Sequence, residues 1–267
     1  MAALNPPQLP PPSQAFTASG WQRMLLLAAG LYVLYAFSNM GISWERFTQG
    51  LSHGANFIAR MFPPDLSKLD ILAKGLLESM QMAVLASALG VLISLPIGLC
   101  AARNLMPVPA TMFFRGLIAV CRSLHPVIMA ILFVKAVGFG ALAGILALIV
   151  ATIGFVGKLF ADAIEEISIK QVEAVRATGA SFMNVILFGV LPQVLSRFVG
   201  FATYQLDSNL RNSTMVGIVG AGGIGGALFA AFQRFEFDFV FTILASIVSI
   251  IVLGELLTNL LKKGFRL

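Results

Sequence analysis

Polar side chains that could contact a solute lie within otherwise apolar stretches of the sequence, in two groups. The first group is Arg122, Ser123 and His125, and the second is Asp207, Arg211, Asn212, Ser213 and Thr214. An arginine in such a place can hold an oxyanion through charge-assisted hydrogen bonds. Cys100 and Cys121 lie in apolar runs, and no cluster of Asp, Glu, His or Cys has catalytic or metal-ligand spacing. These side chains are therefore candidates for contact with a solute, and their spacing predicts no catalysis.

Each group also has a structural interpretation. Asp207 and Arg211 are four residues apart, so on a helix they would be neighbours and could form an ion pair. Ionisable groups within a span are costly and usually face the bundle interior. Arg211 therefore either pairs with Asp207 or contacts a passing anion. His125 precedes Pro126, which predicts a kink, and His125 is then either a hydrogen-bonded structural group or a substrate contact.

A glycine-rich run follows the second group. Val216–Gly225 contains the pattern G-x-G-x-x-G, which elsewhere would indicate dinucleotide binding. The run lies between two apolar stretches without a βαβ unit, so we reject a cofactor site. We expect a broken helix end that lines the outer mouth of a pathway, because glycine-rich backbone is tolerated at membrane depth around a water-filled cavity. Gly220, Gly222 and Gly223 belong to this predicted gate.

Membrane-spanning helices must position these residues. The chain has 267 residues, 58% of them hydrophobic and 11% charged, whereas a soluble domain has about 25% charged residues. So few charges cannot cover a water-exposed surface, and the net charge of +6 does not indicate a nucleic-acid partner. About six stretches are long enough to cross a bilayer. They are approximately 22–40, 72–102, 111–136, 141–162, 193–220 and 238–261. The predicted fold class is an all-α integral membrane protein.

The remaining segments set the domain limits and the orientation. Residues 1–20 are rich in proline and carry no charged side chain, which predicts a cytoplasmic tail and not a cleaved signal. Residues 21–267 form the membrane domain, within which residues 41–70 predict an amphipathic surface helix or loop. Lys and Arg are more frequent on one side, which includes the run Lys262-Lys263-Gly264-Phe265-Arg266. This bias predicts that both termini are cytoplasmic.

One predicted cytoplasmic segment, 164–192, is more polar than its flanks and includes the run EEISIKQVEAVRATGASF. Apolar residues then return at helical spacing. The interruption around Gly179 predicts two short helices joined at a glycine turn. Such an element is too polar to span. We expect it to lie along the inner face of the membrane and to contact a cytoplasmic protein.

Within this segment a motif resembles the cytoplasmic EAA loop of binding-protein-dependent ABC importer permeases. The motif is Glu173-Ala174-Val175, then Gly179-Ala180, then Leu191-Pro192, with Val175 replacing the second Ala and Gly189 an Ile. Further runs resemble the phosphonate and phosphite permease subfamily, namely Arg122–Pro126, Thr152–Leu159 and Val216–Gly225. The resemblance implies a type I importer permease with a MetI-like fold. It also implies that the ATPase-coupling residues are Glu173, Ala174, Arg176, Gly179 and Ala180.

The resemblance implies partners as well. The sequence has no G-x-x-x-x-G-K-[ST] phosphate loop, so ATP and Mg²⁺ are expected on a separate ATPase chain and no cofactor on this one. A periplasmic or extracellular substrate-binding protein is expected outside. About six spans form half of a pathway in this family, which implies either a homodimer or a pair with a closely related second permease, embedded in lipid. No nucleic acid is expected as a partner.

The predicted function is the permease subunit of an ATP-driven importer in a bacterial inner membrane, and the chain is not an enzyme. Its solute would be a phosphonate or a similar phosphorus oxyanion such as phosphite or hypophosphite. One alternative is a permease for methionine or another small solute. A second is a secondary transporter that works without ATP, but we find no inverted repeats. A membrane-embedded oxidoreductase that uses the glycine run is disfavoured as well, because we reject that run as a cofactor site.

Overall fold

The computed structural model describes residues 20–41 and 43–264, with side chains described through residue 256. The chain divides into two compact units, Met1–Ala59 and Arg60–Leu267. The tail was predicted at residues 1–20, of which residues 1–19 lie outside the described residues, as does the basic Arg266. Gly20 is the first residue of a helix.

The first unit contains two helices, α1 (Gly20–Asn39) and α2 (Trp44–Ala59). Helix α1 matches the first predicted span within two residues. Together α1 and α2 are apolar enough to pass as a span, with a bend of 64° between them. Helix α2 confirms the amphipathic helix predicted within residues 41–70, because its polar and apolar side chains lie on opposite faces.

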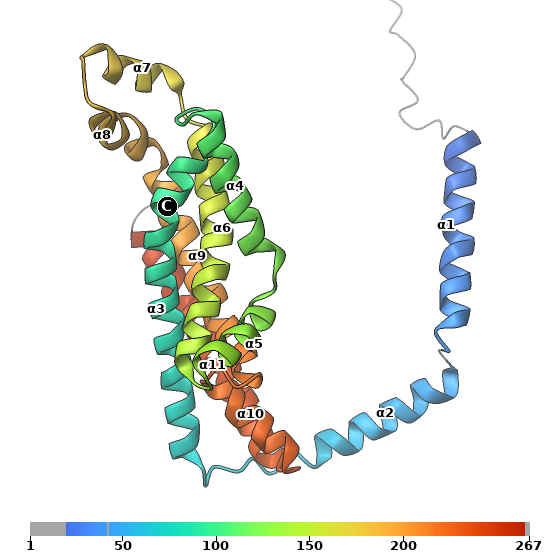
Figure 1. Ribbon diagram of the computed structural model, residues 1–267. Coiled ribbons are helices and arrows are strands. Elements are labelled where there is room, and N and C mark those ends of the chain that lie inside the picture. Colours follow the sequence, from blue (N-terminus) through green and yellow to red (C-terminus); the bar gives the residue numbers. More distant parts are fainter. Residues whose placement is uncertain (1–19, 42, 265–267) are drawn as a thin grey trace, which may run out of the picture. The chain divides into compact units, whose positions relative to one another are not determined.

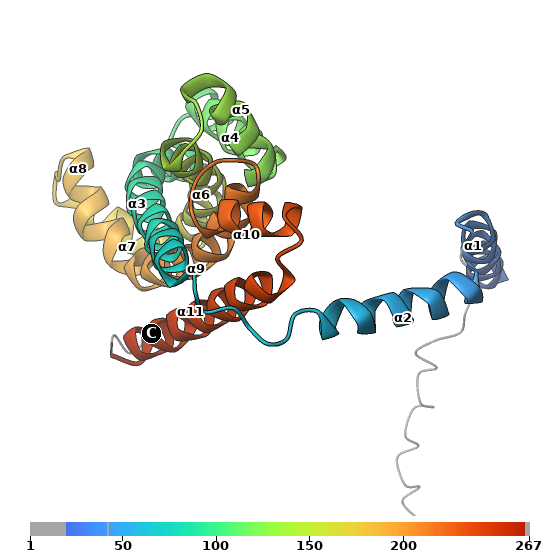
Figure 2. The ribbon, with the colours of Figure 1, turned by 90° about the horizontal axis from the view of Figure 1, so that it is seen from below.

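The second unit is built around α6 (Ala141–Glu165), which packs against α3 (Leu69–Ala101) and α9 (Leu191–Ile218) (Figures 1 and 2). Glycines allow these helices to pack closely against one another. A Cβ atom on Gly90 of α3 would lie 2.5 Å from the Cβ of Thr152 on α6. Helix α11 (Phe237–Gly264) completes the set of long apolar helices. The described residues contain four such helices, or up to six spans if each bent pair counts as one, which agrees with the predicted number.

The predicted span 111–136 is two helices, α4 (Val108–Ser123) and α5 (Pro126–Val137), which meet at 92°. The kink expected at Pro126 is therefore confirmed, and it is a full break. Proline suits the first turn of a helix because its missing N–H has no helical partner there. His125 caps this turn, since its Nδ1 accepts a hydrogen bond from the Val127 N–H at 3.3 Å.

The predicted coupling segment begins with α7 (Ile169–Ala177). The glycine turn is confirmed, but the second helix is not short. It starts with α8 (Phe182–Asn184), passes through a wider π-helical turn (Val185–Val190) and continues as α9. The predicted span starting at residue 193 therefore begins too late. Buried apolar residues of the π-helical turn pack on α7 and α6, so the helix extends toward α7 without interruption.

Helix α9 ends at Ile218, and α10 (Ile224–Gln233) follows a glycine-rich loop. The predicted broken helix end is thus confirmed. No strand occurs in residues 20–41 or 43–264, so the described chain offers no βαβ unit for a dinucleotide. Within the second unit, α7 and α10 lie at opposite ends of the bundle (Figure 1).

Candidate coupling surface and translocation site

Helix α7 docks on the bundle by one face. Val172 is fully buried among apolar side chains of α6, the π-helical turn and α9, and Val175 packs beside it. Gly189, which stands where the motif carries Ile, faces both valines: a Cβ there would be 3.5 Å from the Val172 Cα. Glu173 and Arg176 are exposed. The buried face of α7 therefore holds the helix on the bundle, and its exposed polar face is accessible to another protein.

The turn after α7 depends on Gly179. Its φ is +78°, a conformation that side chains with a Cβ rarely adopt. The Gly179 N–H donates to the Arg176 carbonyl at 3.0 Å, which closes the helix end. A Cβ on Gly179 would have no heavy atom within 4 Å among the described residues, so the surface beside it is open. Ala174 is also exposed, whereas Ala180 is half-buried and packs inward.

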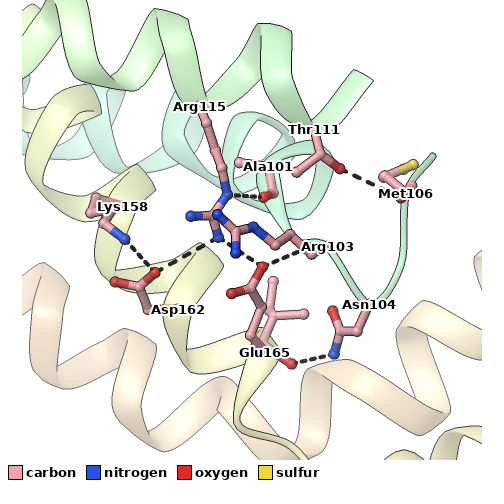
Figure 3. Close-up of polar contacts among 10 residues, drawn as sticks. Ala101, Arg103, Asn104, Met106, Thr111, Arg115, Lys158, Asp162 and Glu165 are labelled. Atoms are coloured by element: carbon pink, nitrogen blue, oxygen red, sulfur yellow. Dashed lines mark hydrogen bonds and ion pairs between the residues drawn. The ribbon is translucent and has the colours of Figure 1, made fainter. Parts of the chain in front are cut away.

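A charged cluster lies at the end of α6, just before α7 (Figure 3). The Arg115 guanidinium donates to Glu165 Oε1 at 2.7 Å and to the Ala101 carbonyl at 3.0 Å. Glu165 also accepts the Arg103 backbone N–H at 2.7 Å. Beside it Lys158 forms an ion pair of 2.6 Å with Asp162. The cluster ties α4 and the end of α3 to the residue that leads into α7.

Two contacts tie the start of α7 to α9. The Ser168 N–H donates to Gln193 Oε1 at 3.0 Å, and Arg197 forms an ion pair with Glu166. Neither these residues nor the charged cluster was among the predicted site residues. The spacing of Lys158, Asp162 and Glu165 along one face of α6 was a usable signal.

A pocket of about 230 Å³ lies where α4 breaks, between α6 and α9. Its polar lining residues are Cys121, Arg122, Tyr204, Gln205, Ser208 and Asn212. Arg122 and Asn212 were predicted pathway residues. Ser123 and His125 do not line the pocket: the Ser123 hydroxyl donates to the Val120 carbonyl at 2.8 Å and His125 caps α5.

Residues of the second predicted group are divided between the faces of α9. Arg211 and Asp207 form the ion pair that their spacing allowed. Ser213 is buried and donates to the Leu210 carbonyl at 2.7 Å. Thr214 packs at the contact with α10, where a Cβ on Gly225 would overlap its carbonyl oxygen. This group therefore contributes helix packing and an ion pair, and only Asn212 lines the pocket.

Four buried polar side chains join the three central helices behind the pocket. Asn209 Nδ2 donates to Ser87 Oγ and to Thr152 Oγ1, both at 2.9 Å. Gln205 Nε2 donates to Thr152 Oγ1 at 3.1 Å and to Asn209 Oδ1 at 3.0 Å. Polar groups inside a membrane must be paired, so the network fixes α3, α6 and α9 in one arrangement. This network was not predicted, although Gln205, Asn209 and Ser213 are spaced one helical turn apart.

The predicted gate glycines form the loop between α9 and α10. Gly220, Gly222 and Gly223 all have positive φ values, of +88°, +82° and +78°. The Gly140 N–H donates to the Gly220 carbonyl at 3.1 Å, and Ser79 on α3 accepts the Ile224 N–H at 2.9 Å. The loop therefore closes the end of the bundle opposite to α7.

In the part of the chain that the structure describes, no group of three or more His, Cys, Asp or Glu residues is placed to hold a metal ion. What the second unit offers is a docking helix at one end, a glycine loop at the other, and a polar pocket between them.

Comparison with known proteins gives one family match. Residues 94–267 match the family described as "Binding-protein-dependent transport system inner membrane component". The phosphite transport system permease protein PtxC of Stutzerimonas stutzeri is 38% identical over 251 residues, covering 92% of this chain and 91% of that protein. The phosphate-import permease protein PhnE of Mycolicibacterium smegmatis is 40% identical over 202 residues, covering 75% of this chain and 38% of that protein.

The fold also has a counterpart among solved structures. A chain of the MetNI methionine ABC transporter, in an inward-facing conformation, superposes with a TM-score of 0.64 and 25% sequence identity. The match covers 75% of this chain and 98% of that one. The architecture expected from the sequence is therefore confirmed.

Proposed function

Because this chain belongs to the family of binding-protein-dependent transport system inner membrane components, we propose that it conducts a small phosphorus oxyanion such as phosphite or a phosphonate. The permease role follows from the family itself. The chain is a multi-pass membrane subunit of an ABC importer, it is not an enzyme, and its family works with a separate ATPase and a substrate-binding protein. ATP and Mg²⁺ bind on that ATPase.

The observation that carries the choice of solute is the similarity to PtxC over nearly the whole of both chains. The relative from Mycolicibacterium smegmatis is named for phosphate import. Phosphate and phosphite are both tetrahedral oxyanions of phosphorus. The methionine transporter matches in fold at lower identity. A positively charged pocket next to α9 also suits an anion better than a zwitterionic amino acid.

The geometry supports a coupling role for α7. The ATPase docks on the exposed face that carries Glu173, Ala174 and Arg176, with Gly179 at the end of this face. Small residues allow close approach, and Glu173 offers a charge to a basic side chain of the partner. Because the opposite face of α7 is buried against α6 and α9, movement of α7 passes directly into both helices.

We further propose that two copies form the pathway. On α9 the side chains of Tyr204, Arg211 and Met215 are exposed along one face, and Ser208 and Asn212 lie between them. A polar helix face within a membrane is stable only against protein or water. A second permease copy facing α9 encloses the pocket and keeps this face from lipid. The α7 end is cytoplasmic in this arrangement, and so are both termini.

Uptake by intact cells tests the proposed solute. The permease is expressed with its own ATPase and binding protein in a bacterium that lacks other routes for phosphite, phosphonate and methionine. We expect growth on phosphite or a phosphonate as the only phosphorus source, provided that the host can oxidise or cleave it, and no rescue of a methionine auxotroph. Methionine rescue without phosphorus uptake would replace the proposal by its main alternative.

A further inference from the structure

Arg122 differs from the other arginines around the pocket in having no counter-charge. Arg211 is paired with Asp207, and Arg115 with Glu165. Among the residues whose side chains the structure describes, 20–41 and 43–256, the Arg122 guanidinium has no hydrogen bond or ion pair. A guanidinium between the two halves of a bent span is costly without a partner. Its partner is therefore expected to come from outside this chain.

The fold places Arg122 at the pocket by close packing. A Cβ on Gly154 of α6 would lie 2.8 Å from the Arg122 Cγ and 3.0 Å from its backbone nitrogen. Only a glycine in α6 lets the last turn of α4 approach this closely. Because the chain then turns by 92° into α5, no further helical turn covers the end of α4. The side chain of Arg122 therefore borders the space between α6 and α9.

The pocket supplies further donors around the arginine. The hydroxyls of Tyr204 and Ser208 and the amide of Asn212 can each donate a hydrogen bond, and no carboxylate is among the lining residues. Its volume of about 230 Å³ is below the range of about 300–1,000 Å³ for pockets of drug-sized ligands. The pocket thus fits a small oxyanion with a few waters.

The walls of the pocket are held in place. Gln205, at its base, is fixed by its bonds to Thr152 and Asn209. The Tyr204 ring stacks on Phe155, with 5.5 Å between ring centroids. Arg122 also borders a second hollow with Arg115 and Lys158, nearer the α7 end. Those two cations are balanced by Glu165 and Asp162, so Arg122 is the uncompensated cation of the three.

We propose that the pocket at the break of α4 is a binding site for the oxyanion in transit, and that Arg122, and not Arg211, supplies its positive charge. This proposal rests on the proposed function for the identity of the anion, but the electrostatic part stands on the pocket alone. Tyr204, Ser208 and Asn212 complete the donor set. Binding is weak, because a solute held tightly in a pathway would not leave it.

The pocket contains a natural reporter, the thiol of Cys121. In the assembled transporter with Cys100→Ala, labelling rates of Cys121 are measured with an anionic and a cationic methanethiosulfonate. Each rate is divided by that of a free thiol, so the ratio reports the local potential. We expect the anionic reagent to be favoured, and Arg122→Gln to lower the ratio by about fivefold or more. Arg122→Lys keeps the charge and should keep the ratio.

A matched control is Lys135→Gln, which removes one positive charge from α5 outside the pocket. It should leave the ratio unchanged. Phosphite should slow labelling of Cys121, whereas sodium chloride of equal ionic strength should not. If Cys121 reacts with neither reagent, the measurement is repeated with Ser208→Cys. Absence of labelling at both positions, or a ratio that Arg122→Gln does not change, overturns the proposal.

The two proposals can fail separately. Normal phosphite uptake by the wild type together with an unaltered labelling ratio in Arg122→Gln would refute the Arg122 site and leave the proposed function intact. A ratio that falls as expected, in a transporter that takes up no phosphorus compound, would keep the anion site and refute the proposed solute.

Discussion

Gly179 combines a conformational and a spatial requirement at the proposed coupling surface. Its positive φ makes other residues costly, by about 1–2 kcal/mol for most L-residues and less for Asn and Asp. The space beside Gly179 is open, so a larger side chain would not clash with other described residues of the permease. A side chain at position 179 would therefore mainly hinder close contact with the ATPase, and would clash little with the permease itself.

Two substitutions of equal size separate these effects. We expect Gly179→Asp to reduce uptake to below about a tenth, because a charge at the turn blocks close docking. Gly179→Asn has the same shape and tolerates the same backbone, so it should retain more transport. Uptake and co-purification of the ATPase are measured for both variants. Normal uptake with normal ATPase association in Gly179→Asp would contradict the coupling role.

The Asp207–Arg211 pair makes a second prediction at this scale. Arg211→Ala leaves a mostly buried carboxylate without its partner, which costs about 1–3 kcal/mol. We expect less permease in the membrane for this variant, and recovery in the double variant Asp207→Asn, Arg211→Ala. Immunoblotting and uptake are measured together. Recovery of the amount without recovery of uptake would show that Arg211 itself contacts the solute.

At the scale of elements, the charged cluster at the end of α6 connects α4 to α7, the proposed coupling helix. Glu165 is about three-quarters buried and joins Arg115 to the Arg103 backbone. Glu166, the next residue, pairs with Arg197 on an exposed surface. Exposed ion pairs contribute little to stability, so these neighbouring carboxylates should respond differently to the same substitution.

We therefore expect Glu165→Gln to lower the ratio of solute imported to ATP hydrolysed, because it weakens the contact with Arg115 by about 1–2 kcal/mol. Glu166→Gln is the matched control and should leave that ratio near wild type. Both are measured in proteoliposomes that contain the complete transporter. Equal effects of the two variants would show that the cluster has no special part in coupling.

The sequence predicts elements best where the pattern is local. Hydrophobic stretches located the spans, Pro126 located the break between α4 and α5, and Gly179 the turn after α7. The predicted start of the span that contains α9 was wrong. Apolar residues at Val185, Ile186 and Val190 fit both a separate short surface helix and a continuous helix that leads into α9. Their burial against α7 decides that the helix is continuous. A tertiary contact of this kind leaves no separate mark in the sequence.

The candidate site shows the same limit. Arg122 and Asn212 were identified as polar residues within spans, and both line the pocket. Their association, 90 residues apart, follows from the glycine contact between α4 and α6, which periodicity does not reveal. The Ser87–Thr152–Asn209 network likewise depends on three helices that meet in space.

At the scale of the whole molecule, the orientation in the membrane is a testable prediction. The α7 end carries Arg103, Lys170 and Arg176, and this excess of basic residues should face the cytoplasm. Single cysteines at Ser67 and Lys263 are labelled in intact cells, after Cys100 and Cys121 are replaced by alanine. An impermeant thiol reagent should reach Ser67→Cys and not Lys263→Cys. The reverse pattern would show that the orientation is inverted.

The uninterrupted helix from Phe182 to Ile218 has a mechanical consequence for the transporter. It has 37 residues, so at 1.5 Å per residue it is a rod of about 55 Å. One end packs on α7 and the other holds the glycine loop, while the Asn209 network lies between them like a fulcrum. A tilt of about 5° about Asn209 moves the α7 end, about 40 Å away, by about 3.5 Å and the glycine end, about 14 Å away, by about 1 Å. A displacement applied to α7 would therefore reach the glycine loop reduced about threefold, so a large movement at one end would give a fine adjustment at the other.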